Sequence, residues 1–218
     1  MFANVSVRVR AVRYVDRTDR RELVHMSKFE SLDERSVFSG ELGEVVQAVQ
    51  PDGRLFERFR RPPGVRIVIV SAGKVLLTEE YRSETGGFDL RLPGGKVFDS
   101  AKSFAEARRT GRMSEAVKEA VAREALEEVG IIVSRPEPLI VAQAGATVEW
   151  DLHYFLVRDF TNAPDGPAPE KGEDITPKWL RPEDIYAAIR ASRMSEWRSV
   201  GVLLGLVFPQ EFPAFAPH

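Results

Sequence analysis

The chain has 218 residues, 43% of them hydrophobic and 29% charged, which indicates an ordinary globular protein of one domain with room for a small appendage. The formal net charge of −2 gives no basic signal for nucleic-acid binding, and the absence of cysteine excludes disulfides, thiolate catalysis and cysteine-held zinc or iron. The longest apolar run, VGVLLGLVF at 200–208, is too short to span a bilayer, and the N-terminal residues lack an apolar signal core. We therefore expect a cytoplasmic protein with no membrane or nucleic-acid partner.

The first part of the chain has the patterns of β-structure. Apolar residues alternate over 5–15, and two alternating runs between 45 and 59 flank Asp52-Gly53, a pair typical of hairpin turns. Proline cannot donate a ladder hydrogen bond, so RRPPG at 60–64 marks a break. We place a boundary there, between an N-terminal β-rich segment, 1–62, and a main domain, 63–218. The apolar run at 65–81 then predicts two central strands joined at Ala72-Gly73.

The second half alternates helices and strands, which predicts an α+β fold with helices on the faces of a mixed sheet. Ser100 and Gly111 have the residue types that begin and end helices, and Ser114 and Gly130 bound a second helix over 115–129. Further elements are strands near 131–133 and 138–145, one long strand over 148–160, a loop rich in proline, glycine and acidic residues at 161–177, a helix that begins at Pro182, and a C-terminal apolar helix.

The helix over 115–129 concentrates acidic residues on one side. Glu124, Glu127 and Glu128 are spaced i, i+3 and i+4, so their carboxylates share one face, and Arg123 lies four residues before Glu127. Small apolar residues form the opposite face, which favours close packing on a sheet. Three carboxylates on one face suit a hard divalent cation, whereas a solvated acidic face is the simpler alternative.

This segment resembles the Nudix box, G-x5-E-x7-R-E-U-x-E-E-x-G-U, in which U is apolar. The part from the first glutamate onward is complete, with Glu115, Arg123, Glu124, Ala125, Glu127, Glu128, Gly130 and Ile131. The resemblance implies an α/β/α sandwich with a mixed β-sheet. It also implies hydrolysis of a diphosphate linkage with Mg²⁺, or Mn²⁺ as its substitute.

The chain departs from the box at its start. The matching glycine is Gly95 in LPGGK, and 19 residues separate it from Glu115 where the family has five, so we infer an insertion of 14 residues. The insertion is either a tolerated surface loop or a lid that contacts substrate. We favour the surface loop, and the observation in support of the lid is the set of basic residues in the insertion: Lys102, Arg108, Arg109 and Arg112.

Outside the box, the resemblance extends over roughly 43–207 to the subgroup that hydrolyses ADP-ribose and other nucleoside diphosphate sugars. EEYR at 79–82 is similar to a segment whose arginine binds substrate, which implies that role for Arg82. The hairpin that ends at Arg61 also resembles this subgroup, and we expect Arg61 to bind substrate too. AGATVE at 144–149 and EKGEDI at 170–175 resemble segments that carry functional glutamates.

The resemblance assigns a role to each of these residues. Glu124 and Glu128 are the expected main metal ligands, Glu127 a third ligand or the anchor of a catalytic water, and Glu115 a support through water. The carbonyl of Gly94 or Gly95 is expected to complete the metal shell. The expected general base is Glu173 or Glu170, with Glu149 as the second choice and also a substrate-binding candidate.

Three alternatives remain open on sequence grounds. The substrate is a nucleoside diphosphate sugar, or instead a nucleoside triphosphate or dinucleoside polyphosphate, or the protein is a nucleotide sensor without catalysis. Intact box glutamates favour an enzyme. The N-terminal β-rich segment predicts a homodimer, because exposed edge strands need cover.

Overall fold

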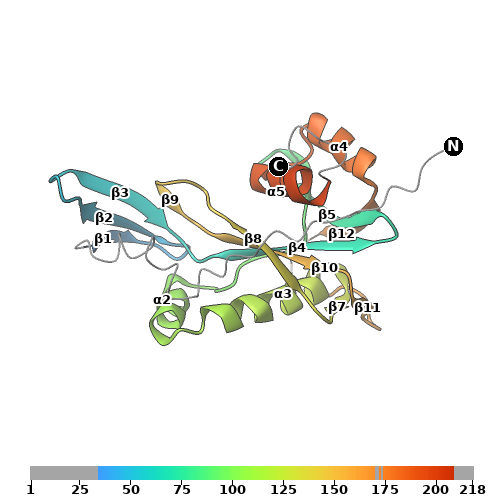
Figure 1. The fold of residues 1–218 in the computed structure, drawn as a ribbon, viewed down its shortest axis with the longest axis horizontal. Coiled ribbons are helices and arrows are strands. Elements are labelled where there is room, and N and C mark those ends of the chain that lie inside the picture. The colour runs from blue at the N-terminus through green and yellow to red at the C-terminus, as the bar shows by residue number, and fades with distance from the viewer. Residues whose placement is uncertain (1–33, 170–171, 173, 209–218) are drawn as a thin grey trace.

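The computed structural model describes residues 34–169, 172 and 174–208. The strand predicted over 5–15 lies outside these residues. Within them, the chain forms a four-stranded sheet at one end and a six-stranded sheet in the centre, with helices on both faces of the central sheet (Figure 1). The α+β class and the α/β/α arrangement predicted from the sequence are confirmed.

The four-stranded N-terminal sheet has the order β1-β2-β3-β9. Its strands are β1 Glu34–Ser39, β2 Glu44–Val49, β3 Leu55–Arg60 and β9 Val148–Glu149. The predicted hairpin at Asp52-Gly53 is confirmed, since β2 and β3 pair in antiparallel register and Gly53 has a φ of 82°. A positive φ is disfavoured for residues with a side chain, so glycine suits this turn.

The central sheet has the order β12-β5-β4-β10-β8, with β6 paired to β5. Strands β4 and β10 run parallel and the other neighbours antiparallel, which confirms the predicted mixed sheet. The strands are β4 Gly64–Ser71, β5 Lys74–Arg82, β6 Gly87–Arg91, β8 Glu137–Ala142, β10 Leu152–Val157 and β12 Ile175–Leu180. A separate two-stranded sheet pairs β7 Ile131–Val133 with β11 Phe160–Asn162.

Helices cover the central sheet on both sides (Figure 1). On one side lie α2 Ala101–Thr110 and α3 Met113–Val129. On the other lie α4 Pro182–Arg190, α5 Trp197–Val202 and a π-helical turn, η1 Leu203–Val207. No helix in the described part of the chain is long and apolar enough to cross a membrane.

Strand β4 divides the interior into two hydrophobic cores. Successive side chains of a strand point to opposite faces, so Val65, Ile67 and Ile69 pack toward α3 while Val68 packs toward α4 and α5. Arg66 shares the second face and is only 7% exposed. A charged side chain therefore lies inside the apolar layer between the central sheet and the helices α4 and α5.

The inserted segment folds as the helix α2. Ser100 caps it by accepting a hydrogen bond from the Ser103 N–H, and Gly111 ends it with a φ of 72°, as predicted. The next helix, α3, ends at Gly130 as predicted but begins at Met113, two residues before the expected start. Ser114 therefore lies inside the helix, and Arg112 precedes it without a side-chain cap.

The single strand predicted over 148–160 is wrong. The chain leaves β9 at Glu149, enters β10 at Leu152, and continues in β11 from Phe160. Strand β9 pairs with β3 of the N-terminal sheet, whereas β10 pairs with β4 and β8 of the central sheet. The alternating sequence pattern continues through the switch, although β9 is partly buried and β10 is buried on both faces.

Substitution of Gly130 is expected to lower the free energy of unfolding more than substitution of Gly111, the other glycine that ends a helix. A Cβ built on Gly130 would lie 2.6 Å from the Gly166 carbonyl carbon, whereas one on Gly111 meets nothing within 4 Å. We expect Gly111→Ala to lose about 1–2 kcal/mol from left-handed strain alone, and Gly130→Ala to lose about 1–3 kcal/mol more from overlap. Urea unfolding of both variants would check this, and equal losses would contradict the packing argument.

Candidate functional site

Two glutamates of α3 lie against the loop that carries Gly94 and Gly95. An oxygen of Glu128 accepts a hydrogen bond of 2.8 Å from the Gly94 N–H. A Cβ built on Gly95 would lie 2.5 Å from Glu124 Oε2, so only glycine leaves room for that carboxylate. The structure thus brings together four of the residues predicted to hold a metal ion: Glu124, Glu128, Gly94 and Gly95.

The backbone of this loop is fixed from the other side by β4. The Val65 N–H donates to the Gly95 carbonyl at 2.9 Å, and Gly94 has a φ of 138°. A Cβ on Gly94 would lie 2.2 Å from the Val65 carbonyl oxygen. The glycine pair therefore allows the loop to pass between β4 and α3, which explains why LPGGK has glycine at both positions.

A buried ion pair holds the same loop in place. Arg66 donates to the Gly94 carbonyl at 2.9 Å and to both carboxylate oxygens of Glu196, at 2.8 and 3.1 Å. Burial alone would raise the pKa of Glu196, but Arg66 and the Ser199 hydroxyl hold it below its usual range. This pair links the residue before α5 to the loop beside α3, across the central sheet.

Arg123 contacts two glutamates of the same helix, Glu124 and Glu127. Its guanidinium lies 2.9 Å from Glu124 and 3.8 Å from Glu127, and it donates to the Lys96 carbonyl at 2.6 Å. The predicted pairing with Glu127 is present, but the contact with Glu124 is shorter. Arg123 thereby connects α3 to the glycine loop a second time.

The positive charge of Arg123 does not fully offset the energetic cost of burying the Glu124 carboxylate. Its side chain is 13% exposed, and burial raises its pKa despite Arg123, with Glu127 adding repulsion. A bound cation would relieve this repulsion. Within 34–169, 172 and 174–208, no three carboxylates or imidazoles are gathered closely enough to hold a metal ion unaided.

Glu115 lies apart from this group in the described structure. Its carboxylate accepts from Arg112 at 2.9 Å and is 57% exposed. Its predicted supporting role at the metal stays a prediction. Glu170 and Glu173, the first choices for the general base, lie outside the described residues.

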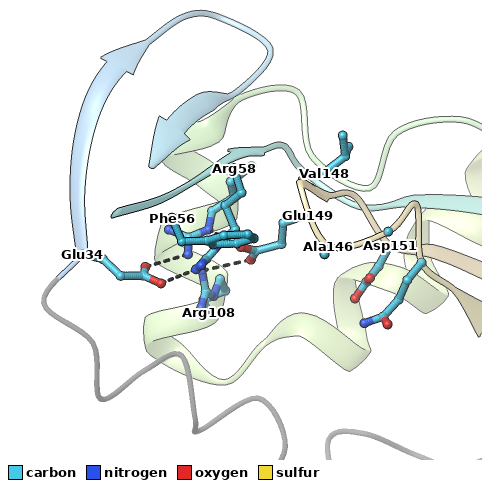
Figure 2. A pocket seen from close by; sticks show the side chains of 11 residues that line it. Glu34, Phe56, Arg58, Arg108, Ala146, Val148, Glu149 and Asp151 are labelled. Atoms are coloured by element: carbon cyan, nitrogen blue, oxygen red, sulfur yellow. Dashed lines mark hydrogen bonds and ion pairs between the residues drawn. The ribbon is translucent and has the colours of Figure 1, made fainter. Parts of the chain in front are cut away.

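Glu149 lies in a cluster of arginines at the edge of the N-terminal sheet (Figure 2). One carboxylate oxygen accepts from Arg58 at 2.8 Å and from Arg60 at 2.9 Å, and the other lies 3.9 Å from Arg108. Glu34 pairs with Arg58 and Arg60 as well. Its contacts in the described residues are with arginines of β3 and α2, so it belongs to a different group of charges from the glutamates of α3.

Arg61 and Arg82, the two arginines predicted to bind substrate, each have a buried nitrogen that makes no hydrogen bond in the described residues. In both side chains this nitrogen is Nε. The other side of Arg82 pairs with Glu80. The Arg61 guanidinium stacks 4.2 Å from the centre of the Trp150 ring, and burial, Arg198 and Arg66 lower its pKa. An anion at Arg61 would satisfy both its donor and its charge.

Sequence reasoning missed the arginines that organise the surroundings of the site. Arg58 and Arg60 looked like ordinary hairpin residues, and their partner Glu149 is distant in sequence. Arg66 had a visible signal, since it is the one charge in the apolar run VRIVIV. A charge in a central strand requires a partner, but the sequence does not identify Glu196 as that partner.

Comparison with known proteins identifies the family and the fold of the chain. The family model described as NUDIX domain matches residues 60–198, which is more than half of the chain. Among solved structures, one described as "Crystal structure of ADP compounds hydrolase" matches with a TM-score of 0.61 and 20% sequence identity, over 84% of this chain and 94% of that chain. This likeness shows a shared fold. No curated protein matches the sequence.

The Arg66–Glu196 pair is expected to be a large source of stability. Arg66→Met leaves the buried Glu196 carboxylate without its partner, and we expect a loss of about 3–5 kcal/mol in the free energy of unfolding. Adding Glu196→Met should restore much of that loss, because no buried charge then remains. The exposed Arg181–Asp184 pair supplies the control, and Arg181→Met should change stability by about 0–1 kcal/mol. Urea unfolding of Arg66→Met, Glu196→Met, the double variant and Arg181→Met measures the coupling, and additive losses in the double variant would refute it.

Proposed function

The chain belongs to the Nudix family of pyrophosphohydrolases, and from this premise we propose that it hydrolyses the diphosphate linkage of an ADP-ribose-like nucleoside diphosphate sugar. The products are a nucleoside monophosphate and a sugar phosphate. The observation that carries the proposal is the contact of Glu124 and Glu128 with the Gly95 and Gly94 backbone. The structure of similar fold that is described as an ADP compounds hydrolase supports this substrate class.

The donor set fits Mg²⁺, with Mn²⁺ as a substitute, because hard cations prefer oxygen ligands. Glu124 and Glu128 are the proposed main ligands, and Glu127 is a third ligand or the anchor of a water molecule. The Gly94 and Gly95 carbonyls each accept one hydrogen bond and retain a lone pair for the metal. Glu115 supports the site through water. When bound, the cation supplies charge neutralisation at the phosphates and a lowered pKa of water.

Arg61 and Arg82 are the proposed phosphate and ribose contacts. Each has a buried Nε donor without a partner in the described residues, and a substrate oxygen would satisfy it. A guanidinium stays charged across the working pH range and matches the geometry of phosphate oxygens. The two arginines would orient the linkage and balance its negative charge.

The general base is proposed to be Glu173 or Glu170, with Glu149 second. The contacts of Glu149 support this order, since one of its oxygens already accepts from two guanidiniums and its other oxygen has Arg108 nearby. The oxygen that accepts from two guanidiniums has no lone pair left to hold an attacking water. Glu149 is better placed to bind substrate, as a hydrogen-bond acceptor.

A single set of variants tests the metal ligands and the base together. We expect wild type with Mg²⁺ to convert ADP-ribose to AMP and ribose 5-phosphate. Mg²⁺ at about 100 times its Kd should add about 2.7 kcal/mol to the free energy of unfolding. Glu124→Gln and Glu128→Gln should lose both effects. The base variant, Glu173→Gln or Glu170→Gln, should keep the stabilisation and lower kcat by about 100-fold or more.

Product chromatography and thermal unfolding provide the two measurements. Glu106→Gln is a matched control, because it changes an exposed glutamate of α2 that pairs with Arg109. Turnover of nucleoside triphosphates or dinucleoside polyphosphates alone would overturn the proposed substrate. Tight binding of a nucleotide without any turnover would instead identify a sensor.

We further propose a homodimer that forms through the N-terminal sheet. Its strands and turns expose five large apolar side chains: Val37, Phe38, Leu42, Val49 and Leu55. Phe38 is 61% exposed and Leu55 60%. Apolar residues gathered on one sheet are typical of an interface between subunits.

Substitution of one aromatic residue tests the dimer. Phe38→Asp should shift the protein from dimer to monomer in analytical ultracentrifugation, since burial of the introduced carboxylate would be unfavourable. Trp197→Asp changes a side chain that is equally accessible, at 66% exposed, but lies at α5 far along the chain. It should leave the association constant unchanged. A monomeric wild type would end the proposal.

A further inference from the structure

A cavity of about 420 Å³ lies beside the Glu149 cluster, between the N-terminal sheet and α2 (Figure 2). Its volume is within the range of small-molecule sites. Three structural units contribute its charged lining, namely β1 and β3, the segment around β9, and the inserted helix α2. The charged residues are Glu34, Arg58, Arg60, Arg108, Glu149 and Asp151.

The charges of this cavity balance. Three guanidiniums face three carboxylates, so the lining has no net charge. Additional phosphates would meet the carboxylates and gain little. A neutral ring with hydroxyl, amino or ring-nitrogen groups can instead donate to the carboxylates and accept from the guanidiniums. Phe56 adds an aromatic surface on which such a ring can pack.

Strand β4 connects the cavity lining to the glycine loop that contacts Glu124 and Glu128. The Asp151 carbonyl accepts from the Gly64 N–H at 2.9 Å, and the next residue, Val65, donates to the Gly95 carbonyl at 2.9 Å. Adjacent residues of β4 thus touch the cavity lining on one side and the Gly95 loop on the other. An elongated ligand can place its diphosphate at α3 and an uncharged end in the cavity.

Arg108 differs from the other basic residues of the insertion. Arg109 pairs with Glu106 at 2.6 Å and is 72% exposed, and Arg112 pairs with Glu115 at the surface. The Arg108 side chain is 31% exposed, lies over the Phe104 ring and lines the cavity. Its distance of 3.9 Å to Glu149 is too long for a hydrogen bond. A ligand oxygen or nitrogen between them would be held by both.

We propose that Arg108 is a specificity-determining residue, carried into the cavity by the inserted helix, and that it binds the uncharged sugar or base of the substrate. The inference rests on the proposed function for the position of the diphosphate. It assigns a role to the insertion. The added helix forms one wall of a binding site, and the family pattern of five residues between glycine and glutamate leaves no length for such a wall.

Arg108→Ala and Arg109→Ala form a matched pair for the test, because they remove neighbouring guanidiniums from one helix. We expect Arg108→Ala to raise KM for ADP-ribose by about 10-fold or more with kcat unchanged, since it removes a charged hydrogen bond made equally in ground and transition states. Arg109→Ala should change neither constant by more than about 2-fold. Thermal unfolding confirms that both variants fold.

Two substrate series identify the bound ring. One varies the sugar on ADP, and the other varies the base with ribose constant. The series whose discrimination disappears in Arg108→Ala marks the end that enters the cavity. Equal KM changes in both variants, or a fall of kcat for every substrate, would overturn the inference.

A binding experiment separates this inference from the proposed function. If wild type hydrolyses none of the substrates in the two series, the proposed function fails, and calorimetric titration with ADP-ribose decides the inference separately. Weaker binding to Arg108→Ala alone supports it, and equal or absent binding overturns it.

Discussion

The buried contact between Arg66 and the Gly94 carbonyl is the constraint on which the site depends. A guanidinium in the interior requires a carboxylate partner, and Glu196 provides it from the segment before α5. The remaining donor capacity of Arg66 is directed at the loop. The two layers of helices on opposite faces of the sheet are therefore joined at the residue whose N–H binds Glu128.

The charged side chains around this contact form two groups that differ in net charge. The α3 group has an excess of carboxylates, with Arg123 as its nearby cation, and this excess favours a divalent metal ion. The group around Glu149 is neutral and surrounds a cavity. A substrate with a charged centre and an uncharged end matches the order of these groups along the protein.

Much of the fold could be predicted from local patterns. Turn residues such as Asp52-Gly53 and the helix ends at Gly111 and Gly130 depend on backbone conformation, which residue type constrains directly. The glutamates of α3 were predictable because helical spacing alone brings them together. The partner choices of Glu149 and Arg66 were not, since each depends on residues more than 80 positions away. The break of the strand at Trp150 was also hidden, because both halves keep the same alternation.

That break has a consequence for how the protein is divided. Strand β9 arrives from the middle of the main domain and pairs with β3, so the N-terminal sheet is assembled from two distant parts of the chain. The sheet is consequently not a module that could be exchanged, grafted or lost as one contiguous stretch of sequence. Removal of the N-terminal strands would leave β9 with an open edge and would take away two arginines that surround Glu149. The stability of this end of the molecule is thereby tied to the segment that lines its cavity.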